Sequence, residues 1–132
     1  MPIGYLDVPT AIDAKAKGAL VRALYEALTE AYPFPDDHRI FIREWDANNA
    51  SQNGSLGSEP ARPVLFIHGP QGANVDAKRR MLTKLNAAVS DAYRLPDFMI
   101  FMHEYPLELV AHEGRLLADN QQRVEEQTKA YS

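Results

Sequence analysis

The sequence predicts an α+β fold in which two tandem β-α-β units form a four-stranded sheet with two helices on one face. Three observations support this prediction: apolar segments of strand length, two stretches with helical periodicity, and a repeat that relates the two halves of the chain. We expect a single domain over residues 1–132, with a first unit at 2–45, a linking loop at 46–63, a second unit at 64–105 and a C-terminal segment at 106–132.

The first unit begins with a short strand at residues 2–8. Between residues 13 and 32 the apolar side chains recur at helical spacing, which predicts a helix with one buried stripe. Residues 38–45 are β-branched and aromatic, a composition typical of a strand. The linking loop is rich in Asn, Ser, Gly and Pro, and it predicts a hairpin turn at Asn53-Gly54.

The second half of the chain repeats the first. A strand at residues 64–68 precedes a helical stripe that matches the first stripe position for position. Residues 100–105, Ile-Phe-Met-His-Glu-Tyr, then match residues 40–45, Ile-Phe-Ile-Arg-Glu-Trp. Because strand-helix-strand connections close with a right-handed crossover, we expect both helices on the same face of one sheet.

The other face of this sheet is expected to lack a covering layer. Phe41, Phe66 and Phe101 would present apolar surface to water there. Exposed apolar patches of this kind indicate a partner surface, and the simplest partner is another copy of the chain in a closed cyclic oligomer.

The C-terminal segment has the least apolar composition. Residues 106–114 predict a short helical turn. Residues 120–132 are polar and offer only Val124, Ala130 and Tyr131 for burial. We therefore expect this stretch to pack on a neighbouring subunit or to fray rather than to join the core.

Composition excludes several classes of function. Hydrophobic residues make up 45% of the chain, and 14 Lys and Arg against 18 Asp and Glu give a net charge of −4. The basic residues are scattered, so no nucleic-acid partner is expected. The chain has no cysteine, its four histidines lack metal-ligand spacing, and no apolar run is long enough to cross a membrane. We expect a cytoplasmic protein with no metal, no cofactor and no membrane partner.

Pro2 is the candidate catalytic group. If Met1 is removed, the ring nitrogen of Pro2 becomes a secondary amine at the start of a strand. An α-amino group titrates near about 8, and burial lowers its pKa toward the range of a good general base. While Met1 remains, the nitrogen is a tertiary amide and cannot act as a base. The alternative reading of a lone proline here is a strand opener.

A proline directly after Met1, opening a duplicated strand-helix-strand chain of this length, resembles the tautomerase superfamily. Pro2-Ile3 and residues 39–44, Arg-Ile-Phe-Ile-Arg-Glu, resemble the pattern of 4-oxalocrotonate tautomerase. This resemblance implies that Arg39 binds a small carboxylate substrate. It also implies a homotrimer in which the proline sites lie near subunit interfaces.

A second branch of that superfamily, cis-3-chloroacrylic acid dehalogenase (cis-CaaD), is also similar in part. Residues 66–69, residues 104–106 and Gly114-Arg115 resemble its motifs. Its strand tyrosine, however, falls at Phe101 in this chain.

Two further departures concern the charged groups of the dehalogenase branch. Its water-activating glutamate falls at His112, and the two arginines that follow its third strand fall in a loop that here contains Gln71 and Ala73. Hydrolytic dehalogenation needs a polarised acid and an activated water, so these differences argue against that activity.

The expected activity is keto-enol tautomerisation of a small 2-oxo or enol acid, which needs a base, a cation for the carboxylate and a group that polarises the carbonyl. Pro2 would be the base, and Arg39 or Arg43 would bind the carboxylate through a guanidinium fork. Arg39 and Arg43 lie four positions apart on one strand and therefore on the same side. Solvated or interfacial ion pairing is the alternative for each arginine.

Polar residues gather after the last strand. His112 or Glu113 could activate water or polarise a carbonyl, and Arg115 could be a second carboxylate ligand. His103 belongs to the same group and Phe101 could line the pocket, while a hydrogen-bonded loop and ordinary packing are the alternatives. His68, at a strand end, is expected to be structural.

Two other functions stay open. The first is a lyase, a hydratase or decarboxylase acting on a three-carbon acid, with Pro2 protonated and His112 or Glu113 assisting. The second is a non-catalytic trimeric binding protein, which would apply if Met1 is retained.

Overall fold

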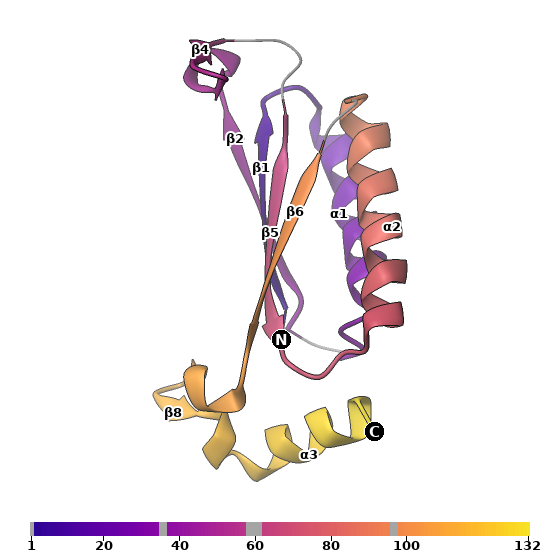
Figure 1. The fold of residues 1–132 in the computed structure, drawn as a ribbon, viewed down its shortest axis with the longest axis vertical. Coiled ribbons are helices and arrows are strands. Elements are labelled where there is room, and N and C mark those ends of the chain that lie inside the picture. Colours follow the sequence, from indigo (N-terminus) through magenta and orange to yellow (C-terminus); the bar gives the residue numbers. More distant parts are fainter. Residues whose placement is uncertain (1, 35–36, 58–61, 96–97) are drawn as a thin grey trace.

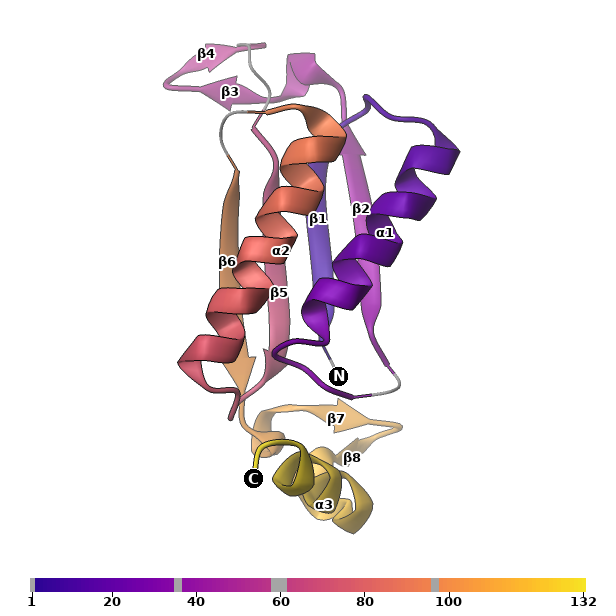
Figure 2. The ribbon, with the colours of Figure 1, turned by 90° about the vertical axis from the view of Figure 1, so that its right-hand side faces the viewer.

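The computed structural model describes residues 2–34, 37–57, 62–95 and 98–132. Four strands form one sheet in the order β2-β1-β5-β6, and two long helices lie side by side on one of its faces (Figures 1 and 2). This arrangement confirms the predicted α+β fold of two β-α-β units. The elements are β1 (Ile3–Pro9), α1 (Ala14–Leu28), β2 (Arg39–Trp45), β5 (Val64–Pro70), α2 (Val75–Tyr93) and β6 (Met99–Tyr105).

The sheet has an approximate twofold arrangement. Strand β1 runs parallel to β2, β5 runs parallel to β6, and the two units meet where β1 and β5 pair antiparallel. The register places Ile3 opposite His68 and Asp7 opposite Val64. Each end of the sheet therefore combines the start of one unit's first strand with the end of the other unit's first strand.

The core lies between the sheet and the helices, because alternate strand side chains point toward the helix layer. The units also repeat a polar contact at the edge of this layer: Lys17 on α1 bonds Glu44 at 2.5 Å, and Lys78 on α2 bonds Glu104 at 2.6 Å. Buried hydrophobic residues include Leu6, Val8, Leu20, Leu24, Leu28, Tyr32, Leu65, Ile67, Met81, Leu85 and Val89.

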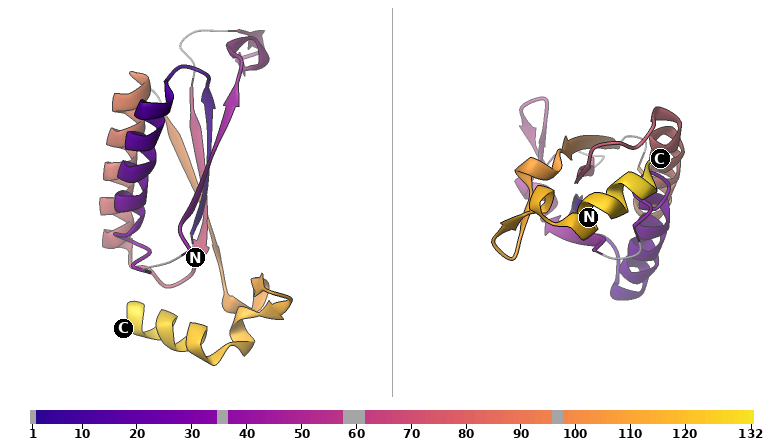
Figure 3. Two further views of the ribbon diagram at one scale, coloured as in Figure 1. Left: turned by 180° about the vertical axis from the view of Figure 1, so that it is seen from behind. Right: turned by 90° about the horizontal axis from the view of Figure 1, so that it is seen from below.

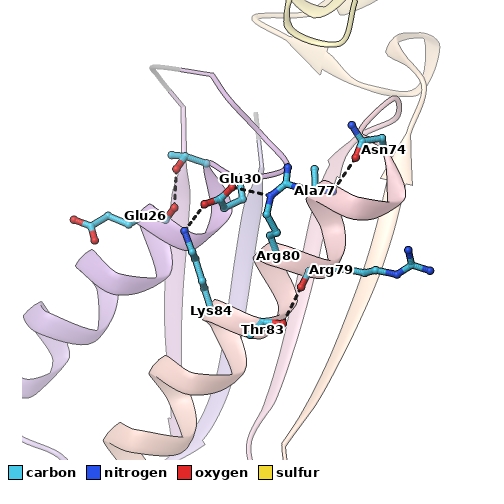
Figure 4. A network of polar contacts seen from close by, with 9 residues as sticks. Glu26, Glu30, Asn74, Ala77, Arg79, Arg80, Thr83 and Lys84 are labelled. Carbon is cyan, nitrogen blue, oxygen red and sulfur yellow. Dashed lines mark hydrogen bonds and ion pairs between the residues drawn. The ribbon is translucent and has the colours of Figure 1, made fainter.

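A polar network joins the two helices at one end (Figure 4). Glu30, just after α1, pairs with both Arg80 and Lys84 on α2. These two partners, Lys84 first, hold the pKa of the Glu30 carboxyl below its usual range. Asn74 caps α2 by accepting a hydrogen bond from the backbone N–H of Ala77 at 2.8 Å. The helix pair is thus fixed by side-chain contacts as well as by its apolar face.

The opposite face of the sheet is exposed in the single chain, as predicted. Phe41, Phe66 and Phe101 are 47%, 37% and 48% exposed. Phe66 stacks on Phe101 and Tyr5 stacks on Phe41, with ring centroids 5.6 and 5.4 Å apart. These aromatic pairs form a continuous apolar surface across the strands.

Each unit is followed by a short hairpin, and the two hairpins lie at opposite ends of the sheet (Figures 1 and 2). Strands β3 (Ser51–Gln52) and β4 (Ser55–Leu56) flank the predicted turn, where Asn53 and Gly54 have φ of 52° and 83°. This confirms the turn at Asn53-Gly54. The rest of the linking loop includes residues 58–61, which lie outside the described residues.

The second hairpin was not expected from the sequence. A 3-10 turn at Leu107–Leu109 agrees with the predicted helical turn, but β7 (Ala111–His112) and β8 (Arg115–Leu116) follow it. Glu113 and Gly114 form the turn with φ of 52° and 79°. Glu113 stands where the first hairpin has asparagine, and glutamate is a poor signal for a left-handed residue.

The last helix, α3 (Gln121–Ala130), lies across the end of the sheet near the N-terminus (Figure 3). Its following residue, Tyr131, donates a hydrogen bond from its hydroxyl to the carbonyl of Ala31 at 3.0 Å and packs its ring edge-on against Phe34. Gln127 donates to the carbonyl of Gln71 at 3.0 Å. The expectation that this stretch frays is wrong, because a few long-range contacts hold it to its own chain.

Two searches of the described residues returned nothing. None of the described helices is long and apolar enough to cross a membrane. Over the same residues no cluster of His, Asp or Glu is arranged to hold a metal ion.

Candidate active site

A cavity of about 360 Å³ lies at the end of the sheet where β1 begins. Its walls come from the start of β1, the end of β5, the segment after β6, strand β7 and helix α3. Most of the lining is apolar, and the polar side chains come from β5, the end of β6 and α3. The lining residues are Ile3, Tyr5, Phe34, His68, Gly69, Pro70, Tyr105, Leu107, Leu109, Val110, Ala111, Leu117, Arg123, Glu126 and Gln127.

Pro2 lies at this end of the sheet and is fully buried. Its carbonyl oxygen accepts a hydrogen bond from the backbone N–H of Arg39 at 3.1 Å, which fixes the start of β1 against β2. Pro2 itself is not among the lining residues, whereas its neighbour Ile3 is. Met1, whose removal the proposed chemistry needs, lies outside the described residues.

The two candidate arginines of β2 have different surroundings. Arg39 is at the Pro2 end of the strand, its side chain is 60% exposed, and its Nη2 lies 3.8 Å from Asp37. Arg43 uses both Nε and Nη2 to donate to the two carboxylate oxygens of Asp7, at 2.7 and 2.8 Å, and stacks over the Tyr5 ring. Arg43 is therefore engaged in a bidentate pair farther along the sheet, and Arg39 is the arginine closer to Pro2.

His68 and Tyr105 form a hydrogen-bonded pair in the cavity wall. His68 Nδ1 lies 2.8 Å from the Tyr105 hydroxyl, and its strand position is opposite Ile3. The ring of His103 stacks on Tyr105 with centroids 4.4 Å apart and the planes 1° from parallel. One proton is shared between His68 and Tyr105, so one further donor, either the Nε2–H of His68 or the O–H of Tyr105, is left for another partner.

An ion pair joins α3 to the segment before β2. Arg123 Nη2 donates to Asp37 Oδ2 at 2.9 Å, and both side chains are about three-quarters buried. The hydrogen bond from Arg123 holds the pKa of the Asp37 carboxyl below its usual range, although burial acts in the opposite direction. Arg123 and Arg39 thus lie on two sides of one carboxylate near Pro2.

Gly69 leaves room for a buried tyrosine beneath the cavity. A Cβ atom at Gly69 would come within 2.7 Å of the ring of Tyr32. Tyr32 is fully buried, and burial, helped by the charge of Glu104, raises its pKa to about 12. Tyr32 is therefore a neutral phenol that supports the cavity floor.

The remaining residues predicted from the sequence do not line this cavity. His112 and Glu113 are exposed at the β7–β8 hairpin, and Arg115 Nη2 reaches the carbonyl of Asp119 at 3.4 Å. Phe101 and His103 lie on the exposed face of the sheet. In the single chain these residues surround the cavity end without entering it.

The structure adds residues that the sequence had not singled out. His68 was expected to be structural, and its pairing with Tyr105 depends on two strand ends that meet only in the fold. Arg123 lies in a segment expected to fray. The one local signal for its helix is Asn120, whose side chain accepts a hydrogen bond from the backbone N–H of Arg123 at 3.3 Å and caps α3.

Comparison with known proteins gives matches in structure but not in sequence. No protein-family model matches the chain, and no curated protein matches it. Among solved structures, the asymmetric trimer of a wild-type fused 4-OT superposes with a TM-score of 0.80 at 19% identity, covering 90% of this chain and 98% of that chain. A symmetric trimer of a wild-type fused 4-OT gives a TM-score of 0.78 at 20% identity, with the same coverage.

A third structure comes from a different activity. The FG41 malonate semialdehyde decarboxylase inhibited by 3-bromopropiolate gives a TM-score of 0.64 at 16% identity, covering 83% of this chain and 87% of that chain. The resemblance to the tautomerase superfamily is therefore confirmed in the fold, over nearly the whole length of the chain. At these identities the likeness concerns the fold alone.

Proposed function

We propose that the protein is a cofactor-independent keto-enol tautomerase that acts on a small 2-oxo or enol carboxylic acid, with Pro2 as the general base after removal of Met1. One observation supports this most directly. Pro2 is buried at the start of β1, next to a cavity of about 360 Å³, in a fold shared with fused 4-OT.

The location of Pro2 suits the chemistry of a base. Burial disfavours the charged form of an amine and lowers its pKa toward neutrality, so the free nitrogen can accept a proton at physiological pH. Pro2 would remove the proton from the carbon next to the substrate carbonyl and return it to another carbon or to the enol oxygen's partner carbon. No other reactant is required, since the proton taken from the substrate is given back to it.

The carbonyl and the carboxylate need their own partners. The His68–Tyr105 pair offers the one free donor described above, which would stabilise the negative charge that develops on the carbonyl oxygen. Arg39, at the Pro2 end of β2, would bind the carboxylate from the side of the exposed sheet face.

The exposed sheet face supports assembly as a homotrimer. The fused 4-OT structures are trimers, and a trimer would cover Phe41, Phe66 and Phe101. In that assembly Arg43 and His103 would lie at an interface. The β7–β8 hairpin, with His112, Glu113 and Arg115, would then be placed to act on the site from a subunit boundary.

The test combines mass spectrometry and an enzyme assay. We expect the purified protein to lack Met1, to tautomerise phenylenolpyruvate, and to gain one adduct with 3-bromopropiolate, the inhibitor of the similar decarboxylase. Pro2→Ala should lose the adduct and the activity. A protein that retains Met1 and forms no adduct would leave the proposed base without its amine and would favour a non-catalytic binding protein.

A lyase is the second candidate, because the malonate semialdehyde decarboxylase shares the fold. In that case Pro2 would be protonated and would act as an acid on a three-carbon acid, with His112 or Glu113 assisting. Product from malonate semialdehyde or an acetylenic acid, without tautomerisation of phenylenolpyruvate, would identify this activity.

A further inference from the structure

We propose that Arg123 on α3 is a carboxylate-binding residue of the cavity, and that its ligand is a monocarboxylate with an apolar body. The identity of the natural ligand rests on the function proposed above, but carboxylate binding itself can be measured without turnover. The site is additional to Arg39, which approaches from the exposed face of the sheet.

Arg123 lines the cavity from a helix that is held in place. Its side chain is only 26% exposed, so a ligand would meet the guanidinium away from bulk water. The contacts of Tyr131 with Ala31 and of Gln127 with Gln71 fix α3 on both sides of the cavity end. A cation on a fixed element binds with less loss of side-chain freedom than one on a mobile loop.

The hydrogen bonds of Arg123 leave capacity for a ligand. Among the described residues, its guanidinium makes one side-chain hydrogen bond, from Nη2 to Asp37. Arg43, by contrast, donates from two nitrogens to both oxygens of Asp7. A guanidinium recognises a carboxylate best through two parallel N–H bonds, so Arg123 still has donors to offer beside its contact with Asp37.

The surroundings of Arg123 define the ligand's other features. Leu107, Leu109 and Val110 give the cavity an apolar wall, which fits a hydrocarbon body. Glu126 lines the same cavity one helical turn after Arg123, and its negative charge opposes a second carboxylate. The cavity therefore suits a ligand with one carboxylate and an apolar remainder.

The test is calorimetric titration of the full chain with hydrocinnamate, an unreactive monocarboxylate with a phenyl body. Arg123→Gln should weaken binding by about tenfold or more, the loss expected for a charge-assisted hydrogen bond. Arg79→Gln, at an exposed pair with Asp76 on α2, is the control and should leave binding unchanged. Hydrocinnamyl alcohol, which lacks the charge, and phenylsuccinate, which has a second carboxylate, should both bind more weakly than hydrocinnamate.

A second variant separates ligand binding from a tethering role. Asp37→Asn removes the same ion pair as Arg123→Gln but keeps the Arg123 charge and removes a competing carboxylate, so hydrocinnamate should bind at least as tightly as to wild type. Equal losses in the two variants would show that the pair only holds α3 and would overturn the proposal. Unchanged binding to Arg123→Gln, or no binding to wild type, would overturn it too. The expected binding pattern without any tautomerase activity would instead contradict the proposed function alone.

Discussion

Pro2 and Pro63 occupy equivalent positions, each directly before the first strand of its β-α-β unit, and both side chains are fully buried. They differ in covalent chemistry. Pro63 is inside the chain, so its nitrogen is always a tertiary amide, whereas that of Pro2 becomes an amine once Met1 is removed. Duplication thus supplied two similar ends of one sheet, and only the end with Pro2 can contain a proline base.

The segments around the two prolines also differ in size. After β6 the chain places Leu107, Leu109 and Val110 in the cavity wall, whereas the equivalent turn after β2 has Ala47 and Asn49. Helix α3 follows the second hairpin and closes the cavity end, and the first hairpin is followed by the linking loop. The comparison teaches that the pocket comes from what was added to the repeat, not from the repeat itself.

The proline comparison gives the largest expected effect. Pro2→Ala should lower kcat/KM for phenylenolpyruvate by about 100-fold to 10,000-fold, the usual contribution of a general base. Pro63→Ala should change kcat/KM by less than about threefold, because this nitrogen cannot exchange a proton. Steady-state kinetics on des-Met protein checks both. Equal losses in the two variants would mean that the prolines act only through the structure.

A glycine pair tests the packing under the cavity. Gly69→Ala should lower the free energy of unfolding by about 2 kcal/mol, since its Cβ would lie 2.7 Å from the buried ring of Tyr32. Gly18→Ala, in the middle of α1 with nothing within 4 Å of the added Cβ, should raise it by about 0.5–1 kcal/mol. Urea unfolding measures both. A neutral Gly69→Ala would show that Tyr32 can move and that the cavity floor is soft.

Sequence periodicity was sufficient for the fold and insufficient for the pocket. The alternating strands and the repeated helical stripes predicted the sheet, the helix layer and the exposed Phe41, Phe66 and Phe101, because burial on one face leaves a regular pattern. Helix α3 has no buried residue of its own and is held by Tyr131 and Gln127 through partners far away in the chain. Such contacts leave no local pattern, so a segment that closes the cavity resembled a fraying end.

A third prediction compares Tyr105 with its repeat equivalent, Trp45. Tyr105→Phe removes the hydroxyl that pairs with His68 and should lower kcat/KM by about tenfold, whether Tyr105 donates to the substrate or fixes the tautomer of His68. Trp45→Phe, at the opposite end of β2, should leave kcat/KM within about twofold. His68→Asn distinguishes the two roles, because it should cost more than Tyr105→Phe only if His68 is the donor. No loss in either cavity variant would remove the pair from the mechanism.

The smallest expected effect concerns the ion pair that ties α3 to the cavity end. The folded-state pKa of Asp37 is lowered by Arg123, so its contribution to stability is present above the unfolded pKa near 4 and is lost as the pH falls through the folded pKa. A double-mutant cycle of Asp37→Asn and Arg123→Gln, followed by urea unfolding, should give a coupling of about 0.5–1 kcal/mol at pH 7. The coupling should vanish near pH 2, where Asp37 is protonated. A coupling that stays the same at both pH values would show that the two side chains interact through packing, and the cavity end would then be held together without this charge pair.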